Sequence, residues 1–488
     1  MGSEKKRLGL IILGLGAQGK RILRHLSALS ADVAKLNWEL NFVGAIDTDS
    51  SAIDRCRAEF PAAFNTAAFR DFSDTNDISS VLTYFTEQAA TRQYNACLFY
   101  DASPSQLHWQ NLRTVIEFDE RLREREVLSE TFFYYFGEKP ILSYSEEDVQ
   151  AFDRAFSKSL QSYPHWCDFV ETKNPAFLEV EKFLDEQNFS VRKMTFWRSS
   201  CVGLERYLFS TRKGVTGGSF MDKSIHDLPL VIQLLKHDRV ATCMAEVGGH
   251  MPLFLSADPS KEDVAMSLAG EAYDPKSILP PAESNASVHL TLNNDAKIVD
   301  VALFSSWLGL SRGGRKAINS LVAPFSKSTR DCIASRIVNP VELVTGYAVD
   351  EARLLHIAGA DRDGRDFAIL ANLLTRNRDD GWARSLSPWA LLKIGDQVSR
   401  LPVGDADALM ACFKDVIFSV IGISERTERA TDYSGLGHAS SVAVHKIAKR
   451  VRDELSEKFE RSGRKLLVHP ARQQAMKKLR PPHCFKQS

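Results

Sequence analysis

A glycine-rich turn near the N-terminus has the spacing that proteins use to bind the phosphates of a dinucleotide. It reads Gly14-Leu-Gly-Ala-Gln-Gly19 and directly follows an apolar run over residues 8–14. In such a turn Gly14 permits a sharp reversal, Gly16 lets the backbone approach a pyrophosphate without an intervening Cβ, and Gly19 lets the next helix pack closely on the strand. The pattern predicts a phosphate site between a buried strand and a helix.

The helix predicted over residues 20–29 would supply the rest of this site, together with Ala17 and Gln18 of the turn before it. Unpaired backbone N–H groups and the positive end of the helix dipole favour an anion at its N-terminus. A second apolar run, residues 42–46, ends in Asp47, whose carboxylate is expected to accept hydrogen bonds from the ribose hydroxyls. A carboxylate repels a 2′-phosphate, so the sequence favours NAD, but NADP stays open because basic side chains follow the turn: Lys20, Arg21 and Arg24. The alternative is an ordinary strand-to-helix turn that binds nothing.

Three further residues have the types that proton transfer at an alcohol requires. Asp222 and His226 lie four residues apart, so on one α-helix they would face the same way. Histidine suits a reversible proton carrier because its ordinary pKa is near neutrality. Lys139 follows an aromatic run and precedes Pro140, and it could donate a hydrogen bond to an oxygen that gains negative charge. Oxidation of an alcohol by hydride transfer needs a group that accepts the hydroxyl proton and a donor that stabilises the negative charge on the oxygen.

Each of the three residues also has a plain structural alternative. Lys139 could be an exposed turn lysine, and His226 could be a histidine of the core. Asp222 could form an ion pair with the neighbouring Lys223. Asp227, which follows the histidine, is interpreted as structural.

Two stretches place these residues in motifs that occur together in one family. Gly137-Glu-Lys-Pro140 and the segment from Gly217 to Asp227 follow the glycine turn in sequence order. The three motifs together resemble those of the Gfo/Idh/MocA family of oxidoreductases, firmly over residues 8–230 and loosely to residue 460. Two positions depart from the family pattern, because Ser219 and Ser224 stand where glycine is common.

The resemblance implies a role for each motif residue. His226 would be the general acid/base, Lys139 would polarise the reacting oxygen, and Asp222 would bind a substrate hydroxyl or relay a proton. Beyond the glycine turn and Asp47, the cofactor-binding residues that it implies are Ser103, Pro104, Glu138 and Lys139.

The resemblance also implies a substrate class and partners. The implied substrate is a small polyhydroxylated molecule, related to a sugar, amino sugar or cyclitol, whose secondary alcohol or ketone exchanges a hydride with NAD(P). One alternative is an enzyme that retains NAD and uses transient oxidation for elimination, hydrolysis or epimerisation of a glycoside. A non-catalytic cofactor-binding protein is the other. A homo-dimer or homo-tetramer is expected.

Two kinds of sheet must position these residues. Short apolar strands alternate with helical stretches up to about residue 145, which indicates an α/β domain with a doubly wound parallel sheet, a Rossmann domain. Beyond it, the alternation is typical of an α+β domain with a large, mostly antiparallel open sheet. We expect strands over residues 8–14, 42–46, 96–100, 132–136 and 191–201, and in several runs within 239–395. We expect helices over residues 20–29, in a stretch from Ser105, and over residues 146–160, 174–187, 405–420 and 440–459, with Asn174 as the cap of the helix 174–187. The segment Asp361-Arg-Asp-Gly364 predicts a hairpin turn.

Composition limits the class of protein and its partners. The chain has 488 residues, 44% of them hydrophobic, with 62 Lys+Arg against 62 Asp+Glu. This is the composition of a folded chain of two or three domains, and it gives no whole-chain attraction to nucleic acid, which is an unlikely partner. The expected domains are 1–145 for the dinucleotide, 146–460 for the substrate and oligomerisation, and 461–488 as a basic tail without carboxylates.

The cysteines and the N-terminus indicate a cytoplasmic location. The eight cysteines are scattered without a C-x-x-C pair or a metal-ligand spacing, so we expect reduced thiols and no metal site. The apolar run from Leu8 to Leu15 is far shorter than the roughly 20 residues that span a bilayer. No membrane or targeting segment is therefore expected.

Overall fold

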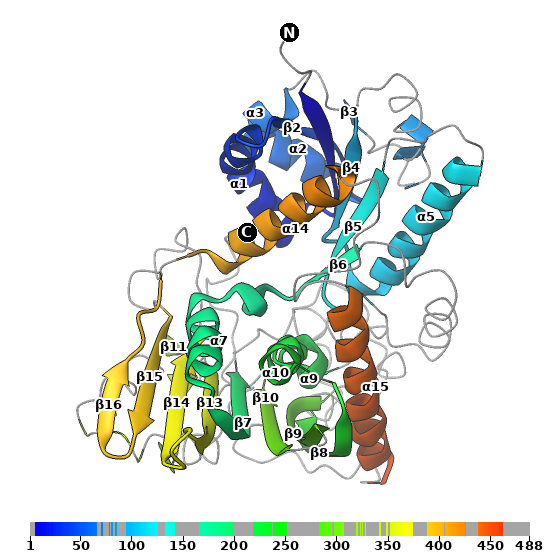
Figure 1. The fold of residues 1–488 in the computed structure, drawn as a ribbon. Helices are drawn as coiled ribbons and strands as arrows, with labels where there is room; N and C mark the ends of the chain where they lie inside the picture. The colour runs from blue at the N-terminus through cyan, green and yellow to red at the C-terminus, as the bar shows by residue number, and fades with distance from the viewer. Residues whose placement is uncertain are drawn as a thin grey trace. The chain divides into compact units, whose positions relative to one another are not determined.

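The computed structural model divides the chain into two compact units (Figure 1). It describes residues 5–65, 70–71, 94–124, 132–141, 165–199, 218–236, 238–250, 283–294, 297–306, 352–373, 388–404, 406–425 and 438–461, with scattered positions between them. The N-terminal unit comprises Met1–Val170 and Leu409–Val442, and the C-terminal unit comprises Glu171–Ala408 and Ala443–Ser488. The expected boundary at residue 145 and the expected helix 146–160 lie outside the described residues, as does the tail from residue 462.

The N-terminal unit contains a six-stranded sheet in the order β3-β2-β1-β4-β5-β6. All of its strand pairs are parallel. This is the strand order of the doubly wound dinucleotide-binding fold, so the predicted Rossmann sheet is confirmed. The strands are β1 (Lys6–Leu13), β2 (Trp38–Ile46), β3 (Arg70–Asp71), β4 (Ala96–Asp101), β5 (Phe132–Glu138) and β6 (His165–Asp168).

A helix from the far end of the chain completes the core of this unit. The helices described here are α1 (Ala17–Ala34), α2 (Ser50–Glu59), α3 (Pro61–Phe64), α5 (Ser105–Glu124) and α14 (Ala408–Glu425). The ring of Phe413 on α14 packs at 5.2 Å from that of Tyr100 on β4 and at 5.5 Å from that of Phe136 on β5. Helix α14 therefore buries its apolar face on the parallel sheet, and this long-range return differs from the continuous 146–460 domain that the sequence predicted.

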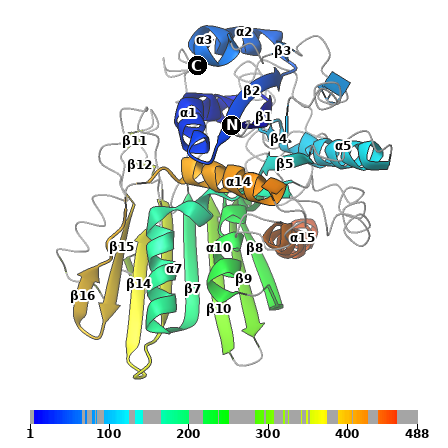
Figure 2. The ribbon, with the colours of Figure 1, turned by 45° about the horizontal axis from the view of Figure 1, so that its top comes forward.

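The C-terminal unit is built on an eight-stranded sheet in the order β16-β15-β14-β13-β7-β10-β9-β8 (Figure 2). Its strands pair antiparallel except β7 with β10, so the predicted mostly antiparallel sheet is confirmed. The strands are β7 (Ser190–Ser199), β8 (Val240–His250), β9 (Glu283–Asn294), β10 (Lys297–Ser306), β13 (Ala352–Ala360), β14 (Asp366–Asn372), β15 (Trp389–Ile394) and β16 (Gln397–Arg400). A separate pair joins β11 (Val341–Glu342) to β12 (Ala348–Val349).

The hairpin turn and the helix cap that the sequence predicted in this unit are both present. The β13–β14 hairpin turns at Gly364, whose φ of 78° favours glycine, and the Asp361 carboxylate accepts the backbone N–H of Arg365 at 2.8 Å. Asn174 caps α7 (Pro175–Gln187), because its Oδ1 accepts the N–H of Ala176 at 2.9 Å. The remaining helical elements are η2 (Val170–Lys173), α9 (Ser219–Asp222), η3 (Ser224–His226), α10 (Leu228–Leu235) and α15 (His438–Arg461), of which η2 and α15 begin just before the boundaries between the units.

The aromatic and thiol side chains are largely core residues. Trp197 stacks on Phe304 with ring centroids 5.4 Å apart, and it shares a buried cluster with Trp389. Among the described residues the free cysteines are all buried: Cys56, Cys97, Cys167, Cys243 and Cys412. Within the described part of the chain, no helix is long and apolar enough to cross a membrane, and no group of His, Cys, Asp and Glu could hold a metal ion.

Candidate active site

The glycine turn joins the ends of three parallel strands. The N–H of Gly14 donates to the carbonyl of Ile46 at 2.8 Å, and the N–H of Ala102 donates to the carbonyl of Leu13 at 2.7 Å. Gly14 has a φ of 87°, and a Cβ there would lie 2.8 Å from the carbonyl oxygen of Ala102. Only glycine fits this close approach, because the backbone that follows β4 occupies the space of a side chain.

The other two glycines of the turn differ in what surrounds them. A Cβ on Gly19 would strike the carbonyl oxygen of Gly14, so this glycine is needed for packing of α1 on β1. A Cβ on Gly16 would meet nothing within 4 Å. Gly16 and Ala17 are exposed and Gln18 is half-buried at the start of α1, where the described residues place no side-chain cap and no acid in the first turn. These features fit a pyrophosphate on the backbone N–H groups.

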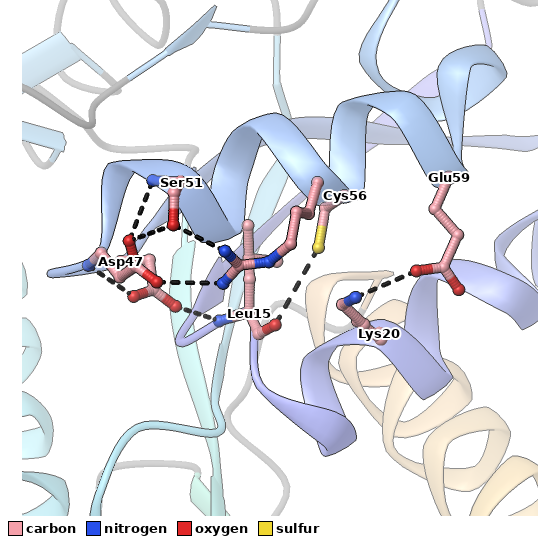
Figure 3. A network of polar contacts seen from close by, with 8 residues as sticks. Leu15, Lys20, Asp47, Ser51, Cys56 and Glu59 are labelled. Carbon is pink, nitrogen blue, oxygen red and sulfur yellow. Dashed lines mark hydrogen bonds and ion pairs between the residues drawn. The ribbon is translucent and has the colours of Figure 1, made fainter. Parts of the chain in front are cut away.

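Asp47 is tied directly to the glycine turn (Figure 3). Its Oδ2 accepts the N–H of Leu15 at 2.7 Å, and its Oδ1 accepts the N–H of Asp49 at 2.9 Å. Beneath the turn, the thiol of Cys56 on α2 points at the carbonyl of Leu15, with 3.9 Å between sulfur and oxygen (Figure 3). The carboxylate at the end of β2 is therefore held at the phosphate turn, in the position where a ribose-binding acid is expected.

The basic side chains near this end of the site are paired with acids. Lys20 and Arg24 on α1 contact Glu59 on α2, with N–O distances of 3.0 Å and 3.2 Å. The hydrogen bond from Lys20 is the main cause that lowers the pKa of Glu59. Arg55 pairs with Asp49 at 3.0 Å in the same way. Each of these three bases therefore has an acidic partner beside the turn.

The turn after β4 carries Ser103 and Pro104. Ser103 is half-buried and Pro104 is exposed. The fully buried Asp101 at the end of β4 accepts the N–H of Ser103 at 3.0 Å and the hydroxyl of Tyr135 at 2.7 Å. The turn is therefore fixed from below by a buried carboxylate.

The end of β5 presents Glu138 and Lys139. Both side chains are half-buried, and the peptide bond between Lys139 and Pro140 is cis. Tyr100 donates to Oε1 of Glu138 at 3.2 Å. Glu138 is the register partner of Asp168 at the end of β6, and burial together with the Glu138 carboxyl raises the pKa of Asp168 well above its ordinary value. The neighbour of the candidate lysine thus lies beside a buried carboxyl whose ionised form is disfavoured.

Asp222 and His226 do not lie on one continuous α-helix, and this corrects the sequence prediction. Helix α9 ends at Asp222, and a single 3₁₀ turn, Ser224–His226, precedes α10. Pro229, in the first turn of α10, lacks an N–H, and the backbone of the segment starts a new helix after His226 instead of extending α9. Asp222 is buried and pairs with Lys223 at 3.1 Å, which is the structural alternative noted for it, and His226 is half-buried. Both belong to the C-terminal unit, whereas Lys139 belongs to the N-terminal unit.

A buried ion network anchors the segment that carries His226. Arg198 on β7 contacts Asp227 at 2.7 Å and Glu171 at 2.9 Å, and all three side chains are at least 96% buried. Arg353 on β13 also contacts Glu171 at 3.1 Å. Burial acts to raise the pKa of Glu171, but the two arginines outweigh burial and lower it. Asp227 is structural, as interpreted from the sequence, since it ties the start of α10 to the sheet.

Sequence reasoning missed the partners of these residues. Arg198 directly follows the buried and mainly apolar residues 194–197 of β7, and a charge next to such a run is a sign of a buried ion pair. His108 and Asp168 carried no comparable signal, because their partners come from other strands.

The fold is shared with solved oxidoreductases. No protein-family model and no curated protein matches the sequence. UDP-N-acetylglucosamine 3-dehydrogenase from Acidithiobacillus ferrooxidans matches at a TM-score of 0.54 and 12% identity, over 93% of this chain and 99% of that one. Aldose-aldose oxidoreductase from Caulobacter crescentus matches at 0.54 and 13%, over 94% and 99%. An inositol dehydrogenase homologue from Azotobacter vinelandii, solved with NAD+, matches at 0.54 and 12%, over 93% and 98%.

The chain has the fold of these oxidoreductases. The likeness extends over nearly the full length of each of them, so both units take part in it. The fold that the motif resemblance implied is thereby confirmed.

Proposed function

We propose that this protein is an NAD-dependent oxidoreductase that transfers a hydride between nicotinamide and a secondary alcohol or ketone of a small polyhydroxylated substrate. The observation that carries the proposal is the open space at Gly16, beside an uncapped helix start and the carboxylate of Asp47. The shared fold supports it, because an inositol dehydrogenase homologue with this fold was solved with NAD+. Other proteins of this fold are named for oxidation of sugars.

The charges around Asp47 favour NAD over NADP. Asp47 is the acid that we expect to bind the ribose hydroxyls, and a 2′-phosphate would add up to two negative charges beside its carboxylate. Of the three bases that kept NADP open, Lys20 and Arg24 are already engaged by Glu59, whereas Arg21 donates a hydrogen bond to the neutral side chain of Gln18 at 3.2 Å. A 2′-phosphate would have to compete with Glu59 for Lys20 and Arg24.

The chain's own residues supply the proton chemistry in this proposal. When bound, the nicotinamide ring supplies the hydride acceptor. His226 takes the proton from the substrate hydroxyl, and Lys139 donates a hydrogen bond to the same oxygen and stabilises its developing negative charge. Asp222 binds a neighbouring hydroxyl or relays the proton. In the reductive direction each transfer runs in reverse.

A binding experiment tests the cofactor site apart from catalysis. NAD affinity is measured by calorimetry for the wild type, for Gly16→Ala and for Gly404→Ala as the matched control. Both glycines have room for a Cβ and neither has a positive φ, so both variants should keep the wild-type Tm. We expect at least tenfold weaker NAD binding for Gly16→Ala alone, because its methyl group would occupy the space of the pyrophosphate. Equal affinity of the two variants contradicts the proposed site.

A turnover experiment tests the catalytic residues. Purified protein with NAD and a panel of polyols, sugars and cyclitols should form reduced nicotinamide, and His226→Ala should lose that activity by a factor of about 10² or more. Lys139→Met should lower kcat more than it raises KM, because its hydrogen bond strengthens as charge develops. Unchanged turnover in His226→Ala refutes the acid/base assignment. Cofactor that co-purifies and never exchanges would instead identify an enzyme that retains NAD.

A further inference from the structure

His108 connects the two turns that follow β4 and β5. It lies in the first turns of α5 and its side chain is 1% exposed. Its Nε2 lies 2.7 Å from the carbonyl oxygen of Ser103, and its Nδ1 lies 2.8 Å from the carbonyl oxygen of Pro140. The first turn carries Ser103 and Pro104, and the second carries Lys139, so one buried ring spans both.

The two contacts determine how many protons the ring carries. A carbonyl oxygen only accepts hydrogen bonds, and a neutral imidazole has one N–H and one lone pair. A neutral ring would direct that lone pair at a carbonyl oxygen within 2.8 Å, on a side chain that is buried from solvent. The doubly protonated ring donates to both oxygens and leaves neither contact repulsive.

A counter-charge for such a ring lies next to it. Oδ1 of the fully buried Asp101 is 4.0 Å from Nε2 of His108. Asp101 accepts hydrogen bonds from the N–H of Ser103, the amide of Asn111 and the hydroxyl of Tyr135, at 3.0, 2.8 and 2.7 Å. An acceptor for three donors is suited to the ionised form.

Tyr135 is a second titratable group in contact with His108. Its hydroxyl lies 3.0 Å from the backbone carbonyl oxygen of His108. Burial, assisted by Asp101, raises the pKa of Tyr135 well above its ordinary value, so the phenol stays neutral and remains a donor. Among the described contacts of His108, Asp101 is thus the single charge, and its sign is opposite to that of a protonated ring.

We propose that His108 is held as an imidazolium and acts as a positioning residue, which ties the Ser103–Pro104 turn to the Lys139–Pro140 turn at the end of the cofactor site where Lys139 is proposed to meet the reacting oxygen. The charge state stands on the geometry of the N-terminal unit alone. The role toward the cofactor rests on the proposed function. Loss of one ring proton would release one of the two turns.

Nitrogen-15 NMR tests the charge state without cofactor or substrate. In protein labelled at histidine, the His108 resonances are identified as those missing from His108→Gln. At pH 8, where an ordinary exposed histidine is overwhelmingly neutral, we expect both His108 ring nitrogens to carry protons. Asp101→Asn removes the counter-charge with little change in shape, and His108 should then be neutral at pH 8. A singly protonated His108 in the wild type at pH 8 overturns the proposal.

Ligand binding tests the positioning role. ADP-ribose keeps the adenosine and the diphosphate of NAD but lacks the nicotinamide. We expect His108→Gln to bind NAD about tenfold more weakly, the effect of losing one hydrogen bond, and to bind ADP-ribose as the wild type does. Equal weakening for both ligands, or none for either, overturns the positioning role. Failure of the wild type to bind either ligand refutes the proposed function, and the NMR result then decides the charge state separately.

Discussion

Replacing Arg198 by methionine should destabilise the protein far more than an ordinary surface substitution. Methionine has a similar length and no charge, so Arg198→Met removes the cation from a network that is almost fully buried. Glu171 keeps Arg353 as a partner, whereas Asp227 loses its contact at 2.7 Å. Removing one partner of a buried ion pair costs about 3–5 kcal/mol, because the remaining charge stays out of water. We therefore expect Arg198→Met to lower the free energy of unfolding by about 3–5 kcal/mol.

A matched control lies on the same strand. Arg192 on β7 pairs with Asp366 on β14, but both side chains are more than 60% exposed. Surface pairs of this kind contribute less than about 1 kcal/mol, so Arg192→Met should change stability little. Chemical unfolding followed by circular dichroism measures both variants under identical conditions.

A double variant separates the lost charge from lost packing. In Arg198→Met combined with Asp227→Asn, the unpaired carboxylate is gone, so at least half of the lost stability should return. The reasoning is refuted if Arg198→Met is within about 1 kcal/mol of Arg192→Met. It is equally refuted if the double variant is less stable than Arg198→Met alone, because the cost would then come from packing rather than from the charge on Asp227.

Three further outcomes can be measured with single variants. Gly19→Ala should lower stability by about 1–3 kcal/mol in a thermal melt, because its Cβ would collide with the carbonyl oxygen of Gly14. Burial, helped by Lys193, lowers the pKa of His356 from 6.5 to about 4. Below pH 6.5 the unfolded chain therefore binds a proton that the folded chain does not, and the free energy of unfolding should fall by about 2 kcal/mol from pH 7 to pH 5. Chemical unfolding at several pH values should show a smaller pH dependence in His356→Gln. Glu59→Gln frees its two basic partners on α1, so the ratio of NADP to NAD affinity should rise several-fold in calorimetry, and an unchanged ratio contradicts the assigned cofactor preference.

The structure confirms some of the predictions made from the motifs and corrects one of them. The glycine turn, the hairpin at Gly364 and the cap at Asn174 are where the sequence predicted them. The shared helix of Asp222 and His226 is not, because the chain leaves the α-helical path at Lys223. The chemistry assigned to Lys139, Asp222 and His226 stays a prediction.

The sequence by itself determined those features whose cause lies within a few residues. A strand followed at once by a Gly-x-Gly-x-x-Gly turn, or an Asn-Pro pair before an apolar helix, is specified by local backbone preferences and capping hydrogen bonds. Only the tertiary structure decided which distant residues meet. Phe413 returns to β4 and β5, Arg198 neutralises Asp227, and His108 spans the turns after two different strands. Such contacts depend on strand order and on the burial of charge, and neither is encoded in any short stretch of chain.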